Sequence, residues 1–330
     1  MKIAVLGAGS WGTTLANLLA GKSVETHLWV REKELLAEMR LQSQNSWYLP
    51  GIDLHGGLQA DTDLAGVVHG ADMCLVVVPC QFLRQVLQQA REHLPKKPVV
   101  VCASKGIEID SLKPMSQVVR DSLGSLNPRY AILSGPSFAR EVVQGMPTAV
   151  SLGCGDKKLG RRIQDVMSTE SFRVYTNEDY KGVELGGALK NIIAIAAGIS
   201  DGLGFGTNAR AALITRGLSE MSRLGRAMGA RERTFMGLSG MGDLVLTCTG
   251  DLSRNRQVGL KLATGRKLLD ILGEMKMVAE GVKTTEAVHD LGKQLGVELP
   301  ITEQVHAVLY EDKEPGEAVK ELMTRELKEE

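Results

Sequence analysis

The sequence has no excess of either charge, because 39 lysines and arginines balance 39 aspartates and glutamates. No basic field therefore favours a nucleic acid partner, and the chain carries no acidic tail. No apolar run reaches the roughly 20 residues that a membrane-spanning helix needs. The content of 43% hydrophobic and 24% charged residues is typical of a soluble globular protein. We therefore expect binding to neither nucleic acid nor membrane.

Cysteine is also scarce. The five cysteines are widely spaced, with no CxxC among them: Cys74, Cys80, Cys102, Cys154 and Cys248. This pattern disfavours a disulfide framework or a zinc site, and it favours reduced thiols. The opening MKIAVLGAGSWG places a positive charge before an apolar run, as a signal peptide does, but the run is too short and ends in glycines. We expect a cytoplasmic protein with no bound metal.

Two hydrophobic patterns divide the 330 residues, a length that already favours two domains. In residues 1–178, short β-branched runs alternate with helical patterns, which predicts a mostly parallel sheet covered on both faces. The strand candidates are KIAVLG, ETHLWV, MCLVVVP, PVVVCAS, RYAILSG, TAVSLG and FRVYT. In residues 179–330 such runs nearly vanish, and helical patterns predict an all-α domain. The helix candidates are ALKNIIAIAAGI, ARAALITRGLSEMSRLGRAMG, RQVGLKLATG, LLDILGEM and KTTEAVHDLGKQL.

The first strand candidate leads into Gly7-Ala8-Gly9-Ser10-Trp11-Gly12 and then into a helical pattern. This is GxGxxG between a strand and a helix, the context that a dinucleotide fingerprint requires. Gly7 would make the turn, Gly9 would let a pyrophosphate approach the backbone, and Gly12 would allow close helix–strand packing. The pattern predicts a Rossmann-type doubly wound sheet that binds a nicotinamide dinucleotide, followed by the helical domain.

The preference between the two nicotinamide dinucleotides is open. The second strand candidate ends at Arg31, about where an NAD-selective site places an acid for the ribose hydroxyls. An arginine there could hold the 2′-phosphate of NADP, or could be an exposed side chain without a role. Glu32 follows directly. We expect NADP(H) to be accepted, with NAD(H) as the alternative.

Lys190 stands in the apolar helical stretch VELGGALKNIIAIAAGI. An unpaired ammonium is costly to bury, and an apolar setting would lower the pKa of the lysine toward a value useful to a base. Gly186 and Gly187 on the same face predict an open groove beside it. The alternative is a lysine that extends to the surface. The six histidines show no pairing or motif context that would suggest a base, and most are predicted to lie in loops or at the surface, so Lys190 is the preferred acid–base candidate. Asn191 could donate to a substrate oxygen or fill a packing defect.

Further polar residues follow strand ends or begin a helix. Lys105 and the segment Gly135–Ser137 follow two strand candidates, at the edge where ligands of such sheets bind. In the helical half, GLSGMGDLVLTCTG predicts a flexible glycine-rich loop, whose Asp243 could pair with Lys190 or simply cap a turn. Ser253-Arg254-Asn255 at a predicted helix start would make a phosphate site. Each segment could also be an ordinary turn, and VAEG indicates a helix C-terminus capped by Gly281.

Seven segments occur in this order up to about residue 305: GAGSWGTTLA, SKGIE, LSGPSFAREV, ELGGALKNIIAIAAGISDGLGFGTNARAALITRGL, GLSGMGDLVLTCTG, SRN and VAEGVKT. Together they resemble the bacterial NAD(P)-dependent sn-glycerol-3-phosphate dehydrogenase family. The resemblance implies interconversion of sn-glycerol 3-phosphate and dihydroxyacetone phosphate, in support of phospholipid synthesis. It implies a dinucleotide-binding domain over residues 1–178, a substrate-binding and catalytic domain over residues 179–330, and a substrate between them. A homodimer is one open expectation.

The resemblance also implies roles for matching residues. Lys190 would be the proton acceptor. Substrate would be bound by Lys105, Gly135, Ser137, Asp243, Ser253, Arg254 and Asn255, with Thr247 as a further candidate. The cofactor would contact Ser10, Trp11, Arg31, Lys105, Ala139, Arg254, Val278 and Glu280. The competing interpretations are a dehydrogenase of the β-hydroxyacid or 6-phosphogluconate group and a dinucleotide sensor without catalysis. SGPSF lacks the GxSxG pattern of a serine hydrolase.

Overall fold

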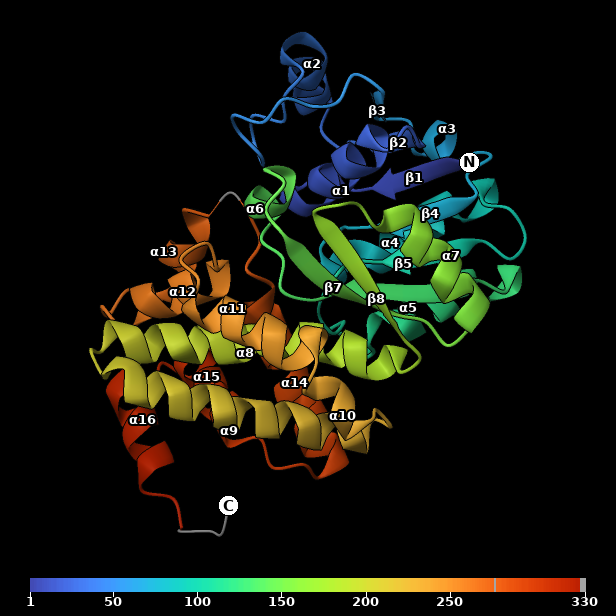
Figure 1. Ribbon diagram of the computed structural model, residues 1–330. Coiled ribbons are helices and arrows are strands. Elements are labelled where there is room, and N and C mark those ends of the chain that lie inside the picture. The colour runs from blue at the N-terminus through green and yellow to red at the C-terminus, as the bar shows by residue number, and fades with distance from the viewer. Residues whose placement is uncertain (276, 327–330) are drawn as a thin grey trace. The chain divides into compact units, whose positions relative to one another are not determined.

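The computed structural model describes residues 1–275 and 277–326 (Figure 1). The chain forms two compact units, residues 1–105 with 113–184 and residues 106–112 with 185–330. The fold class is therefore the predicted one, an α/β unit followed by a helical unit. The assignment of residues 1–178 to dinucleotide binding and 179–330 to substrate binding is functional, and it stays a prediction.

The first unit holds one eight-stranded sheet of order β3-β2-β1-β4-β5-β6-β7-β8. The strands are β1 (Lys2–Leu6), β2 (Glu25–Trp29), β3 (Leu58–Asp61), β4 (Met73–Val76), β5 (Val99–Cys102), β6 (Arg129–Ser134), β7 (Thr148–Gly153) and β8 (Phe172–Asn177). All neighbouring pairs are parallel except β6 and β7. The first six strands have the order 3-2-1-4-5-6 of a Rossmann fold.

Helices cover both faces of this sheet (Figure 1). They are α1 (Ser10–Gly21), α2 (Lys33–Gln42), α3 (Leu64–Val68), α4 (Leu83–Ala90), α5 (Met115–Leu123), α6 (Ala139–Val143) and α7 (Lys157–Met167). Successive strand side chains point to opposite faces: Ile3 belongs to a buried cluster that includes residues of α1, α2, α6 and α7, whereas Ala4 belongs to one that includes residues of α3, α4 and α5. Seven strands match predicted runs. The prediction missed β3, because this edge strand has only four residues and alternates half-buried with exposed side chains.

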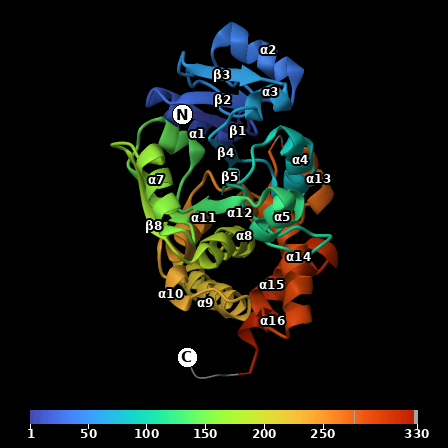
Figure 2. The ribbon, with the colours of Figure 1, turned by 90° about the vertical axis from the view of Figure 1, so that its right-hand side faces the viewer.

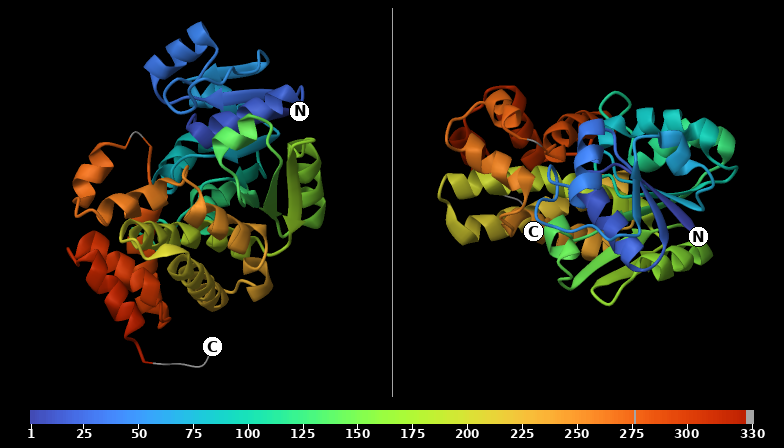
Figure 3. Two further views of the ribbon diagram at one scale, coloured as in Figure 1. Left: turned by 60° about the vertical axis from the view of Figure 1, so that its left-hand side comes forward. Right: turned by 90° about the horizontal axis from the view of Figure 1, so that it is seen from above.

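The second unit is helical, as predicted. Its helices are α8 (Tyr180–Gly202, which begins in the first unit), α9 (Gly206–Ala227), α10 (Glu232–Phe235), α11 (Asp243–Thr249), α12 (Arg254–Leu262), α13 (Leu268–Gly273), α14 (Glu280–Leu295), α15 (Pro300–Tyr310) and α16 (Pro315–Met323). The last three pack in succession and are red in Figures 1 and 3. Figure 2 shows α8 nearly end-on, with α9 beside it, and the side chain of Ile193 on α8 lies against Gly217 on α9.

Helix α8 bears on the expectation that the chain has no membrane span. Among the described residues it alone is long and apolar enough to cross a membrane, with a mean hydropathy of 1.4 over 18 residues. In the structure 94% of that window is buried. Such burial is typical of a core helix of a globular protein, and its high hydropathy reflects its place in the core.

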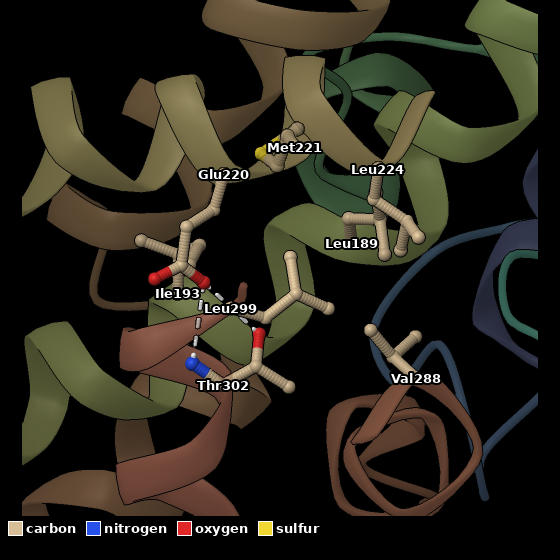
Figure 4. Close-up of a pocket in the computed structure, with 8 residues that line it drawn as sticks. All are labelled: Leu189, Ile193, Glu220, Met221, Leu224, Val288, Leu299 and Thr302. Atoms are coloured by element: carbon tan, nitrogen blue, oxygen red, sulfur yellow. Dashed lines mark hydrogen bonds between the residues drawn. The ribbon is translucent and has the colours of Figure 1, made fainter. Parts of the chain in front are cut away.

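Glu220 on α9 is a buried carboxylate at the start of α15. Its two oxygens accept hydrogen bonds from the backbone N–H of Ile301 and from the N–H and hydroxyl of Thr302. It borders a small, mostly apolar cavity lined by Leu189, Ile193, Met221, Leu224, Val288, Leu299 and Thr302, where its carboxylate points toward Thr302 (Figure 4). Burial raises the pKa of Glu220 to about 7, although its hydrogen bonds act in the opposite direction.

This raised pKa predicts a pH-dependent stability. The folded state holds the Glu220 proton more tightly than the unfolded chain, so this contribution is full below about pH 4.5 and is lost as the pH rises through about 7. The free energy of unfolding of the unaltered protein should therefore fall by up to about 3 kcal/mol over that window. We expect this fall to be absent in Glu220→Gln, because glutamine does not titrate. Chemical denaturation at pH 5 and pH 7.5 measures it. The control is Glu303→Gln, an exposed glutamate of α15, and an unchanged pH dependence in Glu220→Gln would contradict the prediction.

Candidate active site

The glycines of the first loop occupy three different environments. Gly7 has φ +113°, and a Cβ there would lie 2.8 Å from the carbonyl oxygen of Val77. A Cβ on Gly12 would lie 1.9 Å from the carbonyl oxygen of Gly7. Around Gly9, by contrast, a Cβ would meet no atom within 4 Å, and α1 begins at the next residue, Ser10. The turn and the close packing need Gly7 and Gly12, while the backbone at Gly9 is open to a ligand, so the loop fits a dinucleotide pyrophosphate at a helix N-terminus.

A residue that the sequence pattern did not indicate holds this loop. The side-chain amide of Asn45, which is completely buried, donates to the carbonyl oxygen of Ala8 and to the hydroxyl of Thr13, both at 2.8 Å. Asn45 lies outside any helix or strand pattern, so nothing in the sequence pointed to it. Trp11 is half-buried and packs against Phe172, with ring centroids 6.3 Å apart.

The expected cofactor residue Arg31 lies just after β2. Its guanidinium donates twice to one carboxylate oxygen of Glu32. The arginine side chain is 68% exposed, and that of the glutamate 20%. Arg31 is therefore neither a lone positive charge nor a side chain without a partner.

Three residues after β5 and β6 meet at the carbonyl oxygen of Gly135. The ammonium of Lys105 donates to it at 3.4 Å and the hydroxyl of Ser137 at 3.0 Å. Gly135 has φ +147°, and a Cβ there would lie 2.9 Å from the Cα of Val150, so only glycine fits. Ala139 begins α6, and its carbonyl oxygen accepts a hydrogen bond from Thr14 on α1. The first unit thus groups Lys105, Gly135 and Ser137 at one edge of its sheet.

Lys190 in the second unit is buried and paired. Its side chain is 9% exposed, and its ammonium donates to Oδ1 of Asp243 at 2.5 Å and to the hydroxyl of Thr247 at 2.7 Å. The Thr247 hydroxyl in turn donates to the carbonyl oxygen of Asp243. Of the two alternatives for Lys190, the buried position is correct and the surface position is wrong. The apolar setting is only part of its environment, because a carboxylate stabilises its charged form.

The glycines near Lys190 do not all leave space, contrary to expectation. A Cβ on Gly186 would lie 2.5 Å from the carbonyl oxygen of Ser239, so this glycine allows close packing and forms no groove. The prediction of a flexible glycine-rich loop is also wrong. Residues Leu238–Gly242 form a π-helical turn that runs into α11, and Gly240 packs against the backbone of Phe235. This turn fixes the start of α11, where Asp243 is the first residue.

The predicted phosphate segment begins α12 as expected. Ser253 is the N-cap, and its hydroxyl accepts from the N–H of Arg256. Asn255 is buried: its amide donates to Oδ1 of Asn191 and accepts from the N–H of Gly281, both at 2.9 Å. Asn191, next to Lys190, therefore orients Asn255. This amide chain joins α8, α12 and α14.

The VAEG segment differs from its predicted structure. Glu280 and Gly281 begin α14, so Gly281 does not cap a helix C-terminus. A Cβ on Gly281 would lie 2.7 Å from the carbonyl oxygen of Asn191 and from Oδ1 of Asn255, which explains the glycine. The guanidinium of Arg254 donates to the carbonyl oxygen of Val278 at 2.7 Å and interacts with the charge of Glu280. Arg254, Val278 and Glu280, which are all expected to contact the cofactor, thus lie together.

An ionic cluster around the buried carboxylate of Asp201 supports the first turn of α12. Asp201, at the end of α8, accepts from Nε of Arg210 at 2.7 Å with one oxygen and from Nε of Arg256 at 2.8 Å with the other. Arg256 also donates to Asp251 at 3.0 Å. The side chain of Asp201 is only 5% exposed. The cluster holds α12 against the end of α8, and the sequence analysis did not identify it.

The histidines are partly as expected. His55, His69 and His93 are exposed. His289 and His306, however, stack with ring centroids 3.7 Å apart, so the prediction of no pairing is wrong. Helices α14 and α15 bring them together from separate sequence segments. In residues 1–275 and 277–326, no group of three or more His, Cys, Asp or Glu side chains is arranged to hold a metal ion.

The first unit has a Rossmann sheet whose glycine turn is open to a pyrophosphate, and the helical unit has a buried lysine paired to a carboxylate. Together these features are typical of the class of nicotinamide dinucleotide-dependent oxidoreductases. Family models of NAD-dependent glycerol-3-phosphate dehydrogenase match the chain, the N-terminal model over residues 2–160 and the C-terminal model over residues 179–320. The chain belongs to this family.

Individual proteins agree with the family models. The glycerol-3-phosphate dehydrogenase [NAD(P)+] of Solidesulfovibrio magneticus is 65% identical over 100% of both chains. That of Maridesulfovibrio salexigens is 63% identical over 99% of both. The crystal structure of glycerol-3-phosphate dehydrogenase from Coxiella burnetii is 42% identical, covers 98% of this chain and 99% of its own, and superposes with a TM-score of 0.95.

Substitution at Gly12 tests the packing of the loop. We expect Gly12→Ala to lower the free energy of unfolding by roughly 1–3 kcal/mol or more, the cost of overpacking a core, and to weaken dinucleotide binding. Gly21→Ala is the control, since Gly21 ends the same helix and a Cβ there meets no atom within 4 Å. Denaturation and NADPH fluorescence titration measure the two effects. Equal behaviour of the two variants would refute the packing role.

Proposed function

We propose that this chain interconverts sn-glycerol 3-phosphate and dihydroxyacetone phosphate with NAD(P)(H) and supplies glycerol phosphate for phospholipid synthesis. The observation that carries the chemistry is the buried ammonium of Lys190, held by Asp243 and Thr247. Membership of the family, at 65% identity to a glycerol-3-phosphate dehydrogenase [NAD(P)+], supports the substrate and the cofactor.

The proposed role of Lys190 is proton transfer at the oxygen on C2. When the ketone is reduced, the ammonium donates a proton to this oxygen as C2 gains a hydride. In the reverse direction, the neutral amine accepts the hydroxyl proton. Asp243 offsets the cost of burying the ammonium and, with Thr247, fixes the direction of its N–H bonds. The nicotinamide dinucleotide, when bound, supplies or accepts the hydride.

Substrate binding is assigned to residues of both units. In the second unit, Ser253, Arg254 and Asn255 begin α12, where a guanidinium and helix N–H groups suit a phosphate dianion. In the first unit, Lys105 supplies a positive charge and Gly135 and Ser137 supply polar groups beside it. The amide chain from Asn191 to Gly281 leaves Asn255 little rotational freedom, which favours a preformed site.

Cofactor binding is assigned to Gly7, Gly9, Ser10, Trp11, Gly12, Arg31, Lys105 and Ala139 in the first unit, and to Arg254, Val278 and Glu280 in the second. The open backbone at Gly9 supports the pyrophosphate position. The contact of Arg254 with the carbonyl oxygen of Val278 supports a common ligand for this second group. We also propose a cytoplasmic location and a homodimer, and sedimentation equilibrium tests the latter.

Removal of Lys190 tests its proposed role. We expect Lys190→Ala to lower kcat by roughly 10²- to 10⁴-fold, the range that general acid–base catalysis contributes. Lys181→Ala, an exposed lysine of the same helix, should leave kcat unchanged. Dinucleotide binding by both variants should match that of the unaltered protein. Near-normal turnover by Lys190→Ala would remove the lysine from the mechanism.

A substrate comparison tests the reaction itself. We expect oxidation of NADPH or NADH to require dihydroxyacetone phosphate, with no turnover of 2-oxo acids such as those used by the β-hydroxyacid group. The assay follows absorbance of the reduced dinucleotide with each cofactor and each ketone in parallel. Turnover of 2-oxo acids alone would favour the β-hydroxyacid alternative. Tight dinucleotide binding without oxidation by any phosphorylated triose would favour a sensor.

A further inference from the structure

The ion pair between Arg31 and Glu32 lies where the two nicotinamide dinucleotides differ. Nε and Nη2 of Arg31 donate to the same oxygen of Glu32, at 3.0 and 2.6 Å. These two groups form the edge of the guanidinium that binds a phosphate in a bidentate manner. Both residues follow β2, where Rossmann proteins contact the 2′ position of the adenosine ribose.

The carboxylate of Glu32 does not cap helix α2. Glu32 is the N-cap residue of α2, and its carbonyl oxygen accepts from the N–H of Leu36, yet its side chain makes no capping hydrogen bond. A carboxylate near a helix N-terminus is favoured by the helix dipole whether or not it makes a capping hydrogen bond. Here it binds the guanidinium, and Tyr48 lies close enough to interact with both charges.

We propose that Glu32 sets the preference between NAD(H) and NADP(H) by competing with the 2′-phosphate for Arg31. A 2′-phosphate that binds this edge of the guanidinium must displace the carboxylate, and the carboxylate also repels the phosphate. A 2′-hydroxyl needs no displacement, because it can donate to the carboxylate while the ion pair persists. Glu32 therefore weakens NADP(H) binding without blocking it, and Arg31 keeps that binding possible. This inference rests on the cofactor class of the proposed function but not on its substrate.

Direct binding of the two reduced dinucleotides tests the competition. NADPH and NADH are titrated by fluorescence, without any other substrate, against the unaltered protein, Glu32→Gln, Arg31→Gln and the double variant. We expect Glu32→Gln to tighten NADPH binding roughly three- to tenfold, the scale of an exposed ion pair and its repulsion, and to change NADH binding little. Arg31→Gln should weaken NADPH binding roughly tenfold or more.

The double variant separates competition from simple repulsion. If Glu32 acts by occupying Arg31, the gain from Glu32→Gln should be clearly smaller in the Arg31→Gln background, where only the direct repulsion remains. An equal gain in both backgrounds would overturn the competition, as would equal effects on NADPH and NADH. Glu34→Gln, an exposed glutamate in the first turn of α2, controls for the loss of a nearby negative charge and should not shift the ratio.

The outcomes also distinguish this inference from the proposed function. Selective dinucleotide binding without turnover of dihydroxyacetone phosphate would remove the proposed reaction and leave the role of Glu32 intact. Turnover with a dinucleotide preference that is unchanged in Glu32→Gln would remove the inference and leave the reaction intact. Failure of the folded protein to bind either dinucleotide would overturn both.

Discussion

The buried ion pair between Lys190 and Asp243 is the constraint on which the helical unit depends. Both charges are removed from water, with side chains 9% and 1% exposed. Removing one partner of such a pair typically costs about 3–5 kcal/mol, because the other charge remains buried and unpaired. The pair therefore requires α8 and α11 to keep one relative position. The π-helical turn before Asp243, closely packed through Gly186 and Gly240, meets this requirement with backbone contacts.

Small residues extend the same principle to α12 and α14. A Cβ on Gly198 would lie 2.1 Å from the carbonyl oxygen of Arg256, and one on Gly259 would lie 2.1 Å from that of Ile195. The α8 and α12 backbones can be this close only without side chains there. The contact brings Asn255 within hydrogen-bonding distance of Asn191, and Gly281 admits α14 to the same network. Glycines in these helices thus stabilise the positions of polar side chains.

Short-range sequence patterns predicted those features of the fold that neighbouring residues in the chain determine. The glycine turn, seven strands and the helical second unit follow from hydrophobic periodicity and turn chemistry, whereas periodicity left Lys190 open between a buried and a surface position. The sequence could not supply the partners. Asp243 appeared equally suited to a turn, and Asn45 and Asp201 belong to no motif. Gly281 was misassigned as a cap, because a glycine required by a neighbouring backbone has the same local sequence as one required by a positive φ.

The two charged pairs differ in how much a ligand can alter them. Around Lys190 and Asp243, burial leaves few competing partners, so the pair is strong and its geometry is fixed. Around Arg31 and Glu32, solvent weakens the attraction, and a phosphate with higher charge can replace the carboxylate at low cost. A fixed pair suits proton transfer, which needs one geometry. An exchangeable pair suits a cofactor site that must accept either a hydroxyl or a phosphate, because each dinucleotide then leaves the guanidinium with an acceptor.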